Sequence, residues 1–182
     1  MMPDFDQVGE GQSQKEWQKT PEAPAIMVDH VSKWYGQVIG LNDVSLAISG
    51  GVTGVLGMNG AGKSTLLKII VGRLQPSQGQ IRLFGTDPFK NPAPYHRLGY
   101  VSESEKLYDW MTGLDFVTTL ARLHGMTRDE AKVRAEHVLD FVGLADVSNK
   151  EIGKYSKGMR QRVKIAHALV NDPDLIVLDE PL

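Results

Sequence analysis

Apolar residues along the chain gather in short runs that switch between strand-like and helix-like spacing. The run 66–71 is apolar on nearly all sides and therefore predicts a buried helix. The run 175–178 is continuously apolar, as strands at the centre of a parallel sheet are. Gly36 and Asn42-Asp43 are interpreted as turns near the N-terminal end of the pattern. Further strands are expected at 26–31, 44–48, 52–56, 80–84 and 98–101.

Three helices are expected before the last strand, each with its own start and stop signals. Thr112 caps a first helix that ends at Gly125, and Thr127 opens a second, to residue 141, with a capping box completed by Glu130. Ser156 caps the third helix. One face of this third helix carries an apolar stripe made of Met159, Val163, Ala166 and Val170. Together these elements predict the α/β class.

Composition narrows the class of protein without identifying it. The chain has 22 acidic and 20 basic residues, so no net field favours nucleic acid or anionic lipid. There are no cysteines, which excludes disulfides and thiolate metal sites. Neither a secretory signal nor a membrane-length apolar run is found, and we expect a soluble, cytoplasmic protein. Residues 1–24 are polar and predict a disordered tail, which leaves 25–182 as one domain.

A glycine-rich loop lies between the run 52–56 and the helix 66–71. It matches the phosphate-binding pattern G-x-x-x-x-G-K-[ST], in the strand–loop–helix context that the pattern requires. Glycines let N–H groups turn towards an anion, Lys63 adds a full positive charge, and Ser64 offers a hydroxyl to Mg²⁺. The predicted nucleotide-binding residues here are Gly57, Met58, Asn59, Gly60, Ala61, Gly62, Lys63, Ser64 and Thr65.

Two carboxylates follow the apolar run 175–178, at the end where parallel strands present their ligand-binding residues. Asp179 is predicted to hold Mg²⁺ together with Ser64 and phosphate oxygens. Glu180 is placed to orient or deprotonate an attacking water. The alternative is a pair of solvated acids at a strand end, which the upstream phosphate loop disfavours.

A third motif, Tyr155-Ser156-Lys157-Gly158-Met159, combines a serine cap, a small residue and a helix N-terminus. Alone it suits either a second anion site or an ordinary capped helix. In order and spacing, the three motifs resemble the nucleotide-binding domain of ATP-binding cassette (ABC) transporters, whose signature motif is usually Leu-Ser-Gly-Gly-Gln. The resemblance covers residues 57–181, and the Lys-x-Tyr-Gly segment at 33–36 extends it.

The resemblance implies a P-loop NTPase-type fold: a mainly parallel sheet, an antiparallel β subdomain and an inserted helical subdomain at about 104–158. It also implies that ATP and Mg²⁺ bind where two such domains pair head to tail, with Ser156, Lys157, Gly158 and Met159 facing the partner's ATP. Hydrolysis would drive transport through a separate transmembrane permease, with the chain on the cytoplasmic face of the membrane and no nucleic acid involved. Tyr35 would stack on adenine, with a core position for Tyr35 or stacking by Trp34 as alternatives.

The sequence departs from the family pattern at three places. Glu103 stands where glutamine is usual; a carboxylate can also ligand Mg²⁺, and the change suits the exporter-like branch of the family. Lys157 and Met159 replace the usual glycine and glutamine. The sequence stops at Leu182, before the family's dimer-crossing loop and switch histidine, so we expect the C-terminal part of the fold to be missing. Two alternatives therefore stay open: a truncated nucleotide-binding module without turnover, and a soluble ABC protein acting on ribosomes or DNA.

Overall fold

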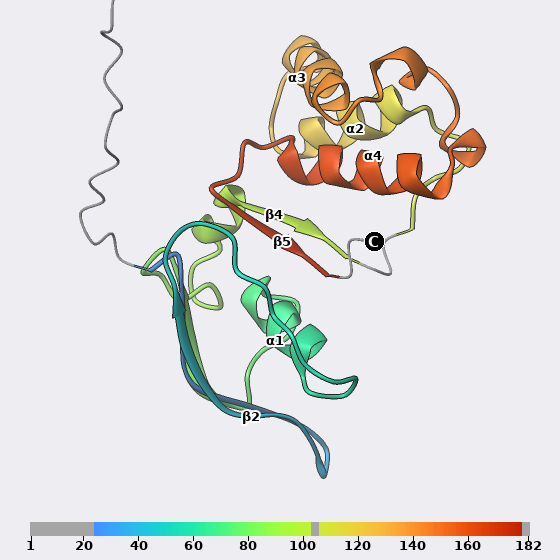
Figure 1. The fold of residues 1–182 in the computed structure, drawn as a ribbon. Coiled ribbons are helices and arrows are strands. Elements are labelled where there is room, and N and C mark those ends of the chain that lie inside the picture. Colours follow the sequence, from blue (N-terminus) through green and yellow to red (C-terminus); the bar gives the residue numbers. More distant parts are fainter. Residues whose placement is uncertain (1–23, 103–105, 180–182) are drawn as a thin grey trace, which may run out of the picture.

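The structure, a computed structural model, describes residues 24–102 and 106–179 (Figure 1). Its strands are β1 (Ile26–Tyr35), β2 (Val38–Ile48), β3 (Gln78–Leu83), β4 (Leu98–Val101) and β5 (Leu175–Leu178). Its α-helices are α1 (Lys63–Ile70), α2 (Gly113–Leu123), α3 (Arg128–Phe141) and α4 (Lys157–Leu169). Short 3₁₀ helices are η1 (Ala93–Arg97), η2 (Ala145–Val147) and η3 (Ile152–Lys154). Most of the expected tail, Glu103 and Glu180 lie outside the described residues.

The strands β1, β2 and β3 form an antiparallel sheet in the order β2-β1-β3. A tight hairpin joins β1 to β2 at Gly36, whose φ of +60° favours glycine. The prediction of a turn at Asn42-Asp43 is wrong, because these residues lie inside β2. Asp43 has a φ of +47° and donates its backbone N–H to Ser32 Oγ over 2.8 Å. The strand therefore shifts register at Asp43 and continues, as strands do at bulges.

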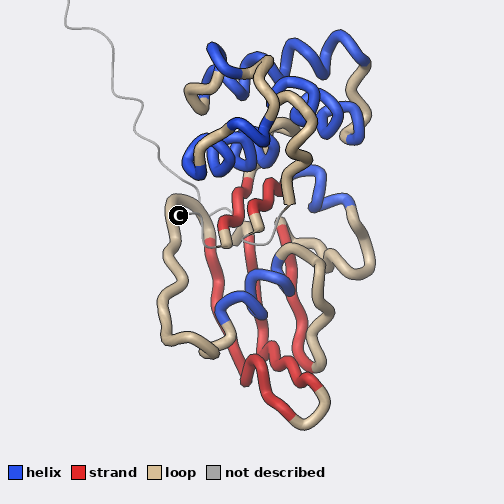
Figure 2. Tube along the Cα trace, turned by 90° about the vertical axis from the view of Figure 1, so that its right-hand side faces the viewer, coloured by secondary structure: helices blue, strands red, loops and turns tan. Residues whose placement is uncertain are grey.

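The strands β4 and β5 pair in parallel, with Leu98 opposite Leu175 and Val101 opposite Leu178. In Figure 2 this pair lies between the antiparallel sheet, with α1 against it, and the group formed by α2, α3 and α4. The pairing confirms the expected combination of parallel and antiparallel sheets in an α/β fold. It also brings the carboxyl ends of β4 and β5 together, so that Asp179 donates its N–H to the Val101 carbonyl over 2.9 Å.

The prediction of a strand at residues 52–56 is wrong, because this segment forms no regular secondary structure. Val52 and Leu56 are almost fully exposed, at 104% and 94%. Gly54 interrupts the run and further glycines flank it, so the entropic cost of an extended backbone is high and few side chains are available to pack. In Figure 1 the segment passes alongside α1 as part of a long loop.

Two hydrophobic cores hold the fold together. One joins the antiparallel sheet to α1 and β5, with a buried set that includes Val31, Leu66, Ile69, Ile81, Leu83 and Val177. The burial of Leu66, Ile69 and Ile70 confirms that α1 is a buried helix. The other core joins α2, α3 and α4, with a buried set that includes Phe116, Val117, Leu139, Leu144 and Val163. Burying such side chains contributes about 1.5–3 kcal/mol each to folding.

The helix α4 rests directly on β4, backbone against backbone. A Cβ atom at Gly99 would lie 2.2 Å from the Ala168 carbonyl oxygen and 3.2 Å from Pro173 Cγ. Only glycine fits at such a separation, because the neighbouring atoms are backbone and ring and cannot move aside. This contact ties the helical part of the molecule to its parallel strands.

The three predicted helix starts are confirmed by their caps. Thr112 Oγ1 accepts a hydrogen bond from Asp115 N over 3.0 Å. Thr127 and Glu130 form the expected capping box, with Thr127 N donating to Glu130 Oε2 over 2.9 Å. Ser156 Oγ accepts from Met159 N over 3.2 Å. Each serine or threonine satisfies an N–H that the helix itself leaves without a partner.

Candidate functional site

The loop before α1 is shaped by two glycines with positive φ. Gly60 has a φ of +82°, and Gly62, the N-cap of α1, has a φ of +88°. A Cβ at Gly62 would lie 2.5 Å from the Gly40 carbonyl oxygen and 3.0 Å from Leu41 Cδ1 of β2. The start of α1 is therefore packed tightly onto the antiparallel sheet. Because Leu66, Ile69 and Ile70 are buried, the core fixes the direction in which the helix N-terminus points.

Lys63 folds back over the loop that precedes it. Its Nζ donates to the carbonyl oxygens of Gly57, over 2.8 Å, and Met58, over 3.0 Å. Ala61 N also donates to the Met58 carbonyl over 3.1 Å. Ser64 and Thr65 follow in the first turn, where helix N–H groups lack intrahelical partners. The arrangement gathers a cation, orphan N–H groups and the positive end of a helix dipole at one place, which suits a phosphate group.

Tyr35, at the end of β1, reaches the same turn of α1. Its hydroxyl lies 3.4 Å from Thr65 Oγ1, and the residue is 48% exposed. Trp34 is the neighbouring residue on a strand and so projects to the opposite face of the sheet. Of the two aromatic candidates, Tyr35 is therefore the one beside the loop.

Asp179 lies at the carboxyl end of β5 and is 7% exposed. No hydrogen bond or ion pair to its carboxylate is recorded among residues 24–102 and 106–179. Within those ranges, no three His, Asp or Glu side chains cluster as metal ligands. Asp179 and Ser64 nevertheless offer the carboxylate and hydroxyl oxygens that Mg²⁺ prefers, and a buried carboxylate without a counter-charge suits a cation. The donor set fits Mg²⁺, although the described contacts do not join Asp179 directly to Ser64.

The residues of the third motif begin α4. Ser156 caps the helix, Lys157 is exposed, and a Cβ at Gly158 would meet no atom within 4 Å. Met159 is partly buried against the core of the three helices. Packing against the described residues therefore does not require glycine at this position, and among those residues the surface above it is open.

Sequence reasoning missed the residues that hold this motif in place. Arg160 Nη1 donates to Asp109 Oδ1 over 2.6 Å and to the Ile152 carbonyl over 3.1 Å. Tyr155 is buried, and its hydroxyl donates to the Val147 carbonyl over 2.8 Å. An arginine one turn into a capped helix gives no local sign of its partner, because Asp109 is 51 positions away.

The comparisons with known proteins agree with this geometry. The family model described as "ABC transporter" matches residues 41–182. The chain belongs to the ABC transporter family. This membership confirms the family that the three motifs indicated.

Two curated ABC relatives are similar to the chain over most of its length. ABC transporter ATP-binding protein NatA of Bacillus subtilis (strain 168) is 46% identical over 144 residues, which cover 78% of this chain and 58% of NatA. Taurine import ATP-binding protein TauB of Jannaschia sp. (strain CCS1) is 41% identical over 148 residues, covering 81% and 54%. The chain thus spans about half the length of the curated relatives it matches.

A solved structure described as the ATP binding subunit of an ABC transporter has the same fold. It superposes with a TM-score of 0.71 at 28% identity, and the match covers 87% of this chain and 67% of the other. The match confirms the fold class that the sequence predicted, an α/β fold of the ABC ATP-binding type.

Proposed function

We propose that this chain is the ATP-binding subunit of an ABC transporter, or the part of one that binds the phosphates of ATP. The observation that carries the proposal is the shared core of α1 and β5. Leu66 and Ile69 of α1 and Val177 of β5 belong to this one core, and the glycine loop with Lys63 and the buried residue Asp179 adjoin these two elements. An anion-binding helix start and a nearby acid are the two parts that a Mg-nucleotide site needs.

In this proposal each residue has a distinct task. The N–H groups of residues 57–65 cradle the phosphates, and the Lys63 amine leaves the Gly57 and Met58 carbonyls to contact the outer phosphates. Ser64 and Asp179 would hold Mg²⁺, which when bound neutralises phosphate charge. Glu103 is a further candidate ligand. Glu180 would orient or deprotonate the attacking water.

Pairing of two copies, or of this chain with a second ATP-binding domain, would complete each site. The open surface at Gly158 supports this, since an α4 N-terminus capped by Ser156 can approach a phosphate closely. Tyr35, beside Thr65, would then stack on the adenine ring.

The membrane component would be a separate permease. None of the helices among the described residues has the length and apolar character needed to cross a bilayer. We propose that the chain works at the cytoplasmic face against such a permease. One relative is named for taurine import.

Mg-ATP binding to the 182-residue protein, measured by calorimetry, tests the proposal. Lys63→Ala is expected to lower the affinity at least tenfold, because a charge-assisted contact to phosphate is lost. Lys68→Ala, on the exposed side of the same helix, is the matched control and should bind like the parent. Equal affinity of Lys63→Ala and the parent would refute the phosphate-loop assignment.

Phosphate release separates turnover from binding alone. Glu180→Gln removes the proposed base while keeping the shape of the side chain, so turnover should fall while Mg-ATP affinity is retained. A parent protein that binds Mg-ATP but releases no phosphate would favour the nucleotide-binding module without turnover.

A further inference from the structure

The loop 106–112, which leads into α2, is held against the segment 148–154 by backbone hydrogen bonds. Gly153 N donates to the Asp109 carbonyl over 2.9 Å, and Ile152 N donates to the Met111 carbonyl over 2.9 Å. A Cβ at Gly153 would lie 3.1 Å from the same Asp109 carbonyl oxygen. The two segments therefore pack backbone to backbone at this point.

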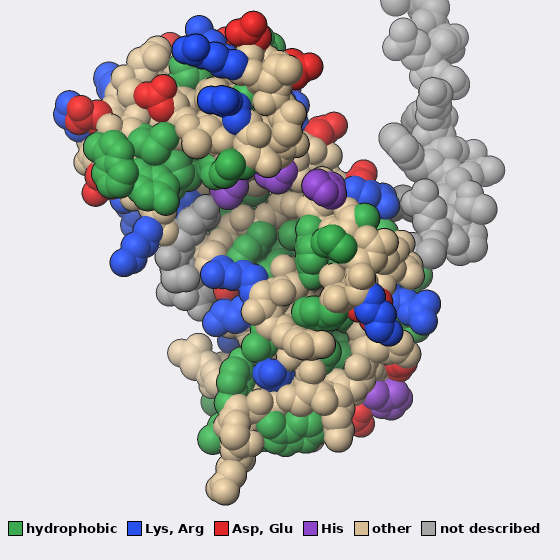
Figure 3. Space-filling view, turned by 180° about the vertical axis from the view of Figure 1, so that it is seen from behind, with side chains coloured by type: hydrophobic (Ala, Val, Ile, Leu, Met, Phe, Trp, Pro, Cys, Tyr) green, Lys and Arg blue, Asp and Glu red, His purple; other side chains and the backbone are tan. Residues whose placement is uncertain are grey.

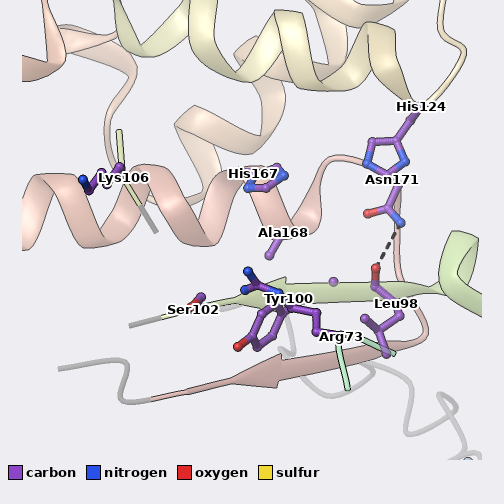
Figure 4. A pocket seen from close by; sticks show the side chains of 10 residues that line it. Arg73, Leu98, Tyr100, Ser102, Lys106, His124, His167, Ala168 and Asn171 are labelled. Atoms are coloured by element: carbon purple, nitrogen blue, oxygen red, sulfur yellow. Dashed lines mark hydrogen bonds between the residues drawn. The ribbon is translucent and has the colours of Figure 1, made fainter. Parts of the chain in front are cut away.

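The same loop runs from the side of α4 to an exposed aromatic pair. Lys106 and His167 line one cavity of about 470 Å³, and Figure 4 shows Lys106 and Asn171 on opposite sides of His167. Because Asn171 follows the end of α4, Lys106 lies towards its start. Further along, Tyr108 and Trp110 are 51% and 73% exposed, with ring centroids 5.0 Å apart. Figure 3 shows hydrophobic side chains gathered on the surface of the helical part.

Arg160 joins this loop to the first turns of α4. Its Nη1 donates to Asp109 Oδ1 over 2.6 Å and to the Ile152 carbonyl over 3.1 Å, so one guanidinium contacts both of the paired segments. Its backbone N–H donates to the Ser156 carbonyl over 2.9 Å. The side chains of Arg160 and Asp109 are 34% and 65% exposed, so water screens their attraction. The contact therefore fixes geometry more than it adds stability.

The charges at the start of α4 give Asp109 a second effect. The helices α2 and α3 carry Asp115 and Asp129 in their first turns, whereas α4 has no acid in its first turn and begins with Lys157. Asp109 is an acid outside α4 that offsets the positive end of its dipole. A change at the contact of Asp109 with Arg160 can thus act through position or through charge.

We propose that Arg160 is a positioning residue for the reaction with ATP, because through Asp109 it makes the start of α4 and the loop 106–112 one body. This rests on the proposed function, in which the surface at Gly158 faces the ATP of a second domain. Coupling between two sites is reciprocal. Occupation of the surface at Gly158 therefore restrains the loop with its exposed aromatic pair, and a load on that pair shifts the surface at Gly158.

Amide hydrogen exchange with and without Mg-ATP tests the link. In the parent, Mg-ATP should slow exchange in residues 107–112 about tenfold, as well as at the start of α4. Arg160→Met and Asp109→Asn should each abolish the slowing in 107–112, because both break the same contact. Arg134→Met, which removes hydrogen bonds to the end of α4 but leaves this contact in place, is the control and should keep the slowing.

The same two variants separate position from charge. Asp109→Asn makes the start of α4 more positive, whereas Arg160→Met makes it less positive. If Arg160 acted through charge alone, the two variants would change the slowing in opposite directions, and that result would overturn the proposal. Slowing in 107–112 that persists in both variants would overturn it as well.

A measurement without nucleotide tests the link on its own. Because Asp109 and Arg160 share one contact, their losses in urea unfolding should be non-additive in the double variant. Additive losses would overturn the proposal. A parent that binds no Mg-ATP, or binds it without slowing at the start of α4, would contradict the proposed function instead, and the double variant distinguishes these two failures.

Discussion

Arg134 of α3 and Arg162 of α4 cap the C-terminal ends of each other's helices. Arg134 Nε donates to the Val170 carbonyl over 2.9 Å, and its Nη2 donates to the Leu169 carbonyl over 2.8 Å. In return, Arg162 Nη1 donates to the Gly143 carbonyl over 3.0 Å. The last carbonyls of a helix lack intrahelical partners and carry the negative end of its dipole, so each cation stabilises the other helix. The exchange fastens α3 to α4 at two places.

Replacing these arginines should therefore lower the stability of the helical part. Arg134→Met is expected to lower the free energy of unfolding by about 2 kcal/mol, because its hydrogen bonds are charged and half-buried. Arg162→Met should cost about 1 kcal/mol, since its side chain is more exposed. Urea unfolding measures both. Arg128→Met, on the exposed first turn of α3, is the control, and losses no larger than its own would contradict the reciprocal caps.

Alanine substitutions at two glycines of the phosphate loop distinguish the cost of backbone strain from the cost of a steric collision. Gly60 and Gly62 both have positive φ, and Ala at either position costs roughly 1–2 kcal/mol for that reason. Only at Gly62 does an added Cβ also collide with the Gly40 carbonyl, whereas Gly60 has open space. We expect Gly62→Ala to lower the melting temperature clearly more than Gly60→Ala. Equal losses would mean that α1 is not held against β2 as described.

Replacing Gly158 by alanine should raise the stability of the protein and lower its ATP turnover. A Cβ at Gly158 would meet no atom of the described residues within 4 Å, so Gly158→Ala is expected to stabilise α4 by up to about 1 kcal/mol. If α4 faces a second domain's ATP, the same methyl group should reduce ATP turnover on the order of tenfold, because it blocks close approach. Thermal unfolding and phosphate release on one sample give both numbers. A stabilised variant with unchanged turnover would count against head-to-tail pairing through α4.

Stability should depend on pH through His30. Its Nδ1 lies 2.7 Å from Asp43 Oδ1, and the hydrogen bond and charge of Asp43 raise the pKa of His30 above 6.5. A raised pKa in the folded state means that the pair stabilises fully below the unfolded-state pKa and loses its effect as pH rises through the folded value.

The variant His30→Gln makes this dependence measurable. Its loss of melting temperature relative to the parent should be larger at about pH 5.5 than at about pH 8.5. A loss that is the same at both pH values would show that Asp43 does not hold the histidine proton.

Local signals in the sequence were enough to predict the helices. Thr112, Thr127 and Ser156 cap the helices that their sequence context predicted, because a cap is formed by residues three positions apart. The segment 52–56 was predicted wrongly. A short apolar run becomes a strand only when a neighbouring edge pairs with it, and a local pattern carries no information on that pairing.

Part of the candidate site could also be read from the sequence. The loop 57–65 and Asp179 stand out by spacing and by the apolar runs beside them. Stacking of Tyr35 on adenine was inferred only through the family, and neither the contact of Tyr35 with Thr65 nor the pair Arg160–Asp109 was foreseen. Tyr35 and Thr65 belong to β1 and α1, and Asp109 lies in the loop before α2, so both contacts depend on tertiary packing that no local periodicity encodes.

The glycine at the junction of α4 and β4 has a mechanical consequence. Because Gly99 packs directly against the Ala168 carbonyl, no flexible side chain separates the helix from the strand at this point. We therefore expect a tilt of α4 about its C-terminal end, where Ala168 lies, to move β4 with it. If the start of α4 faces a second ATP-binding domain, as proposed, pairing at that surface would be transmitted to the parallel strands through this contact.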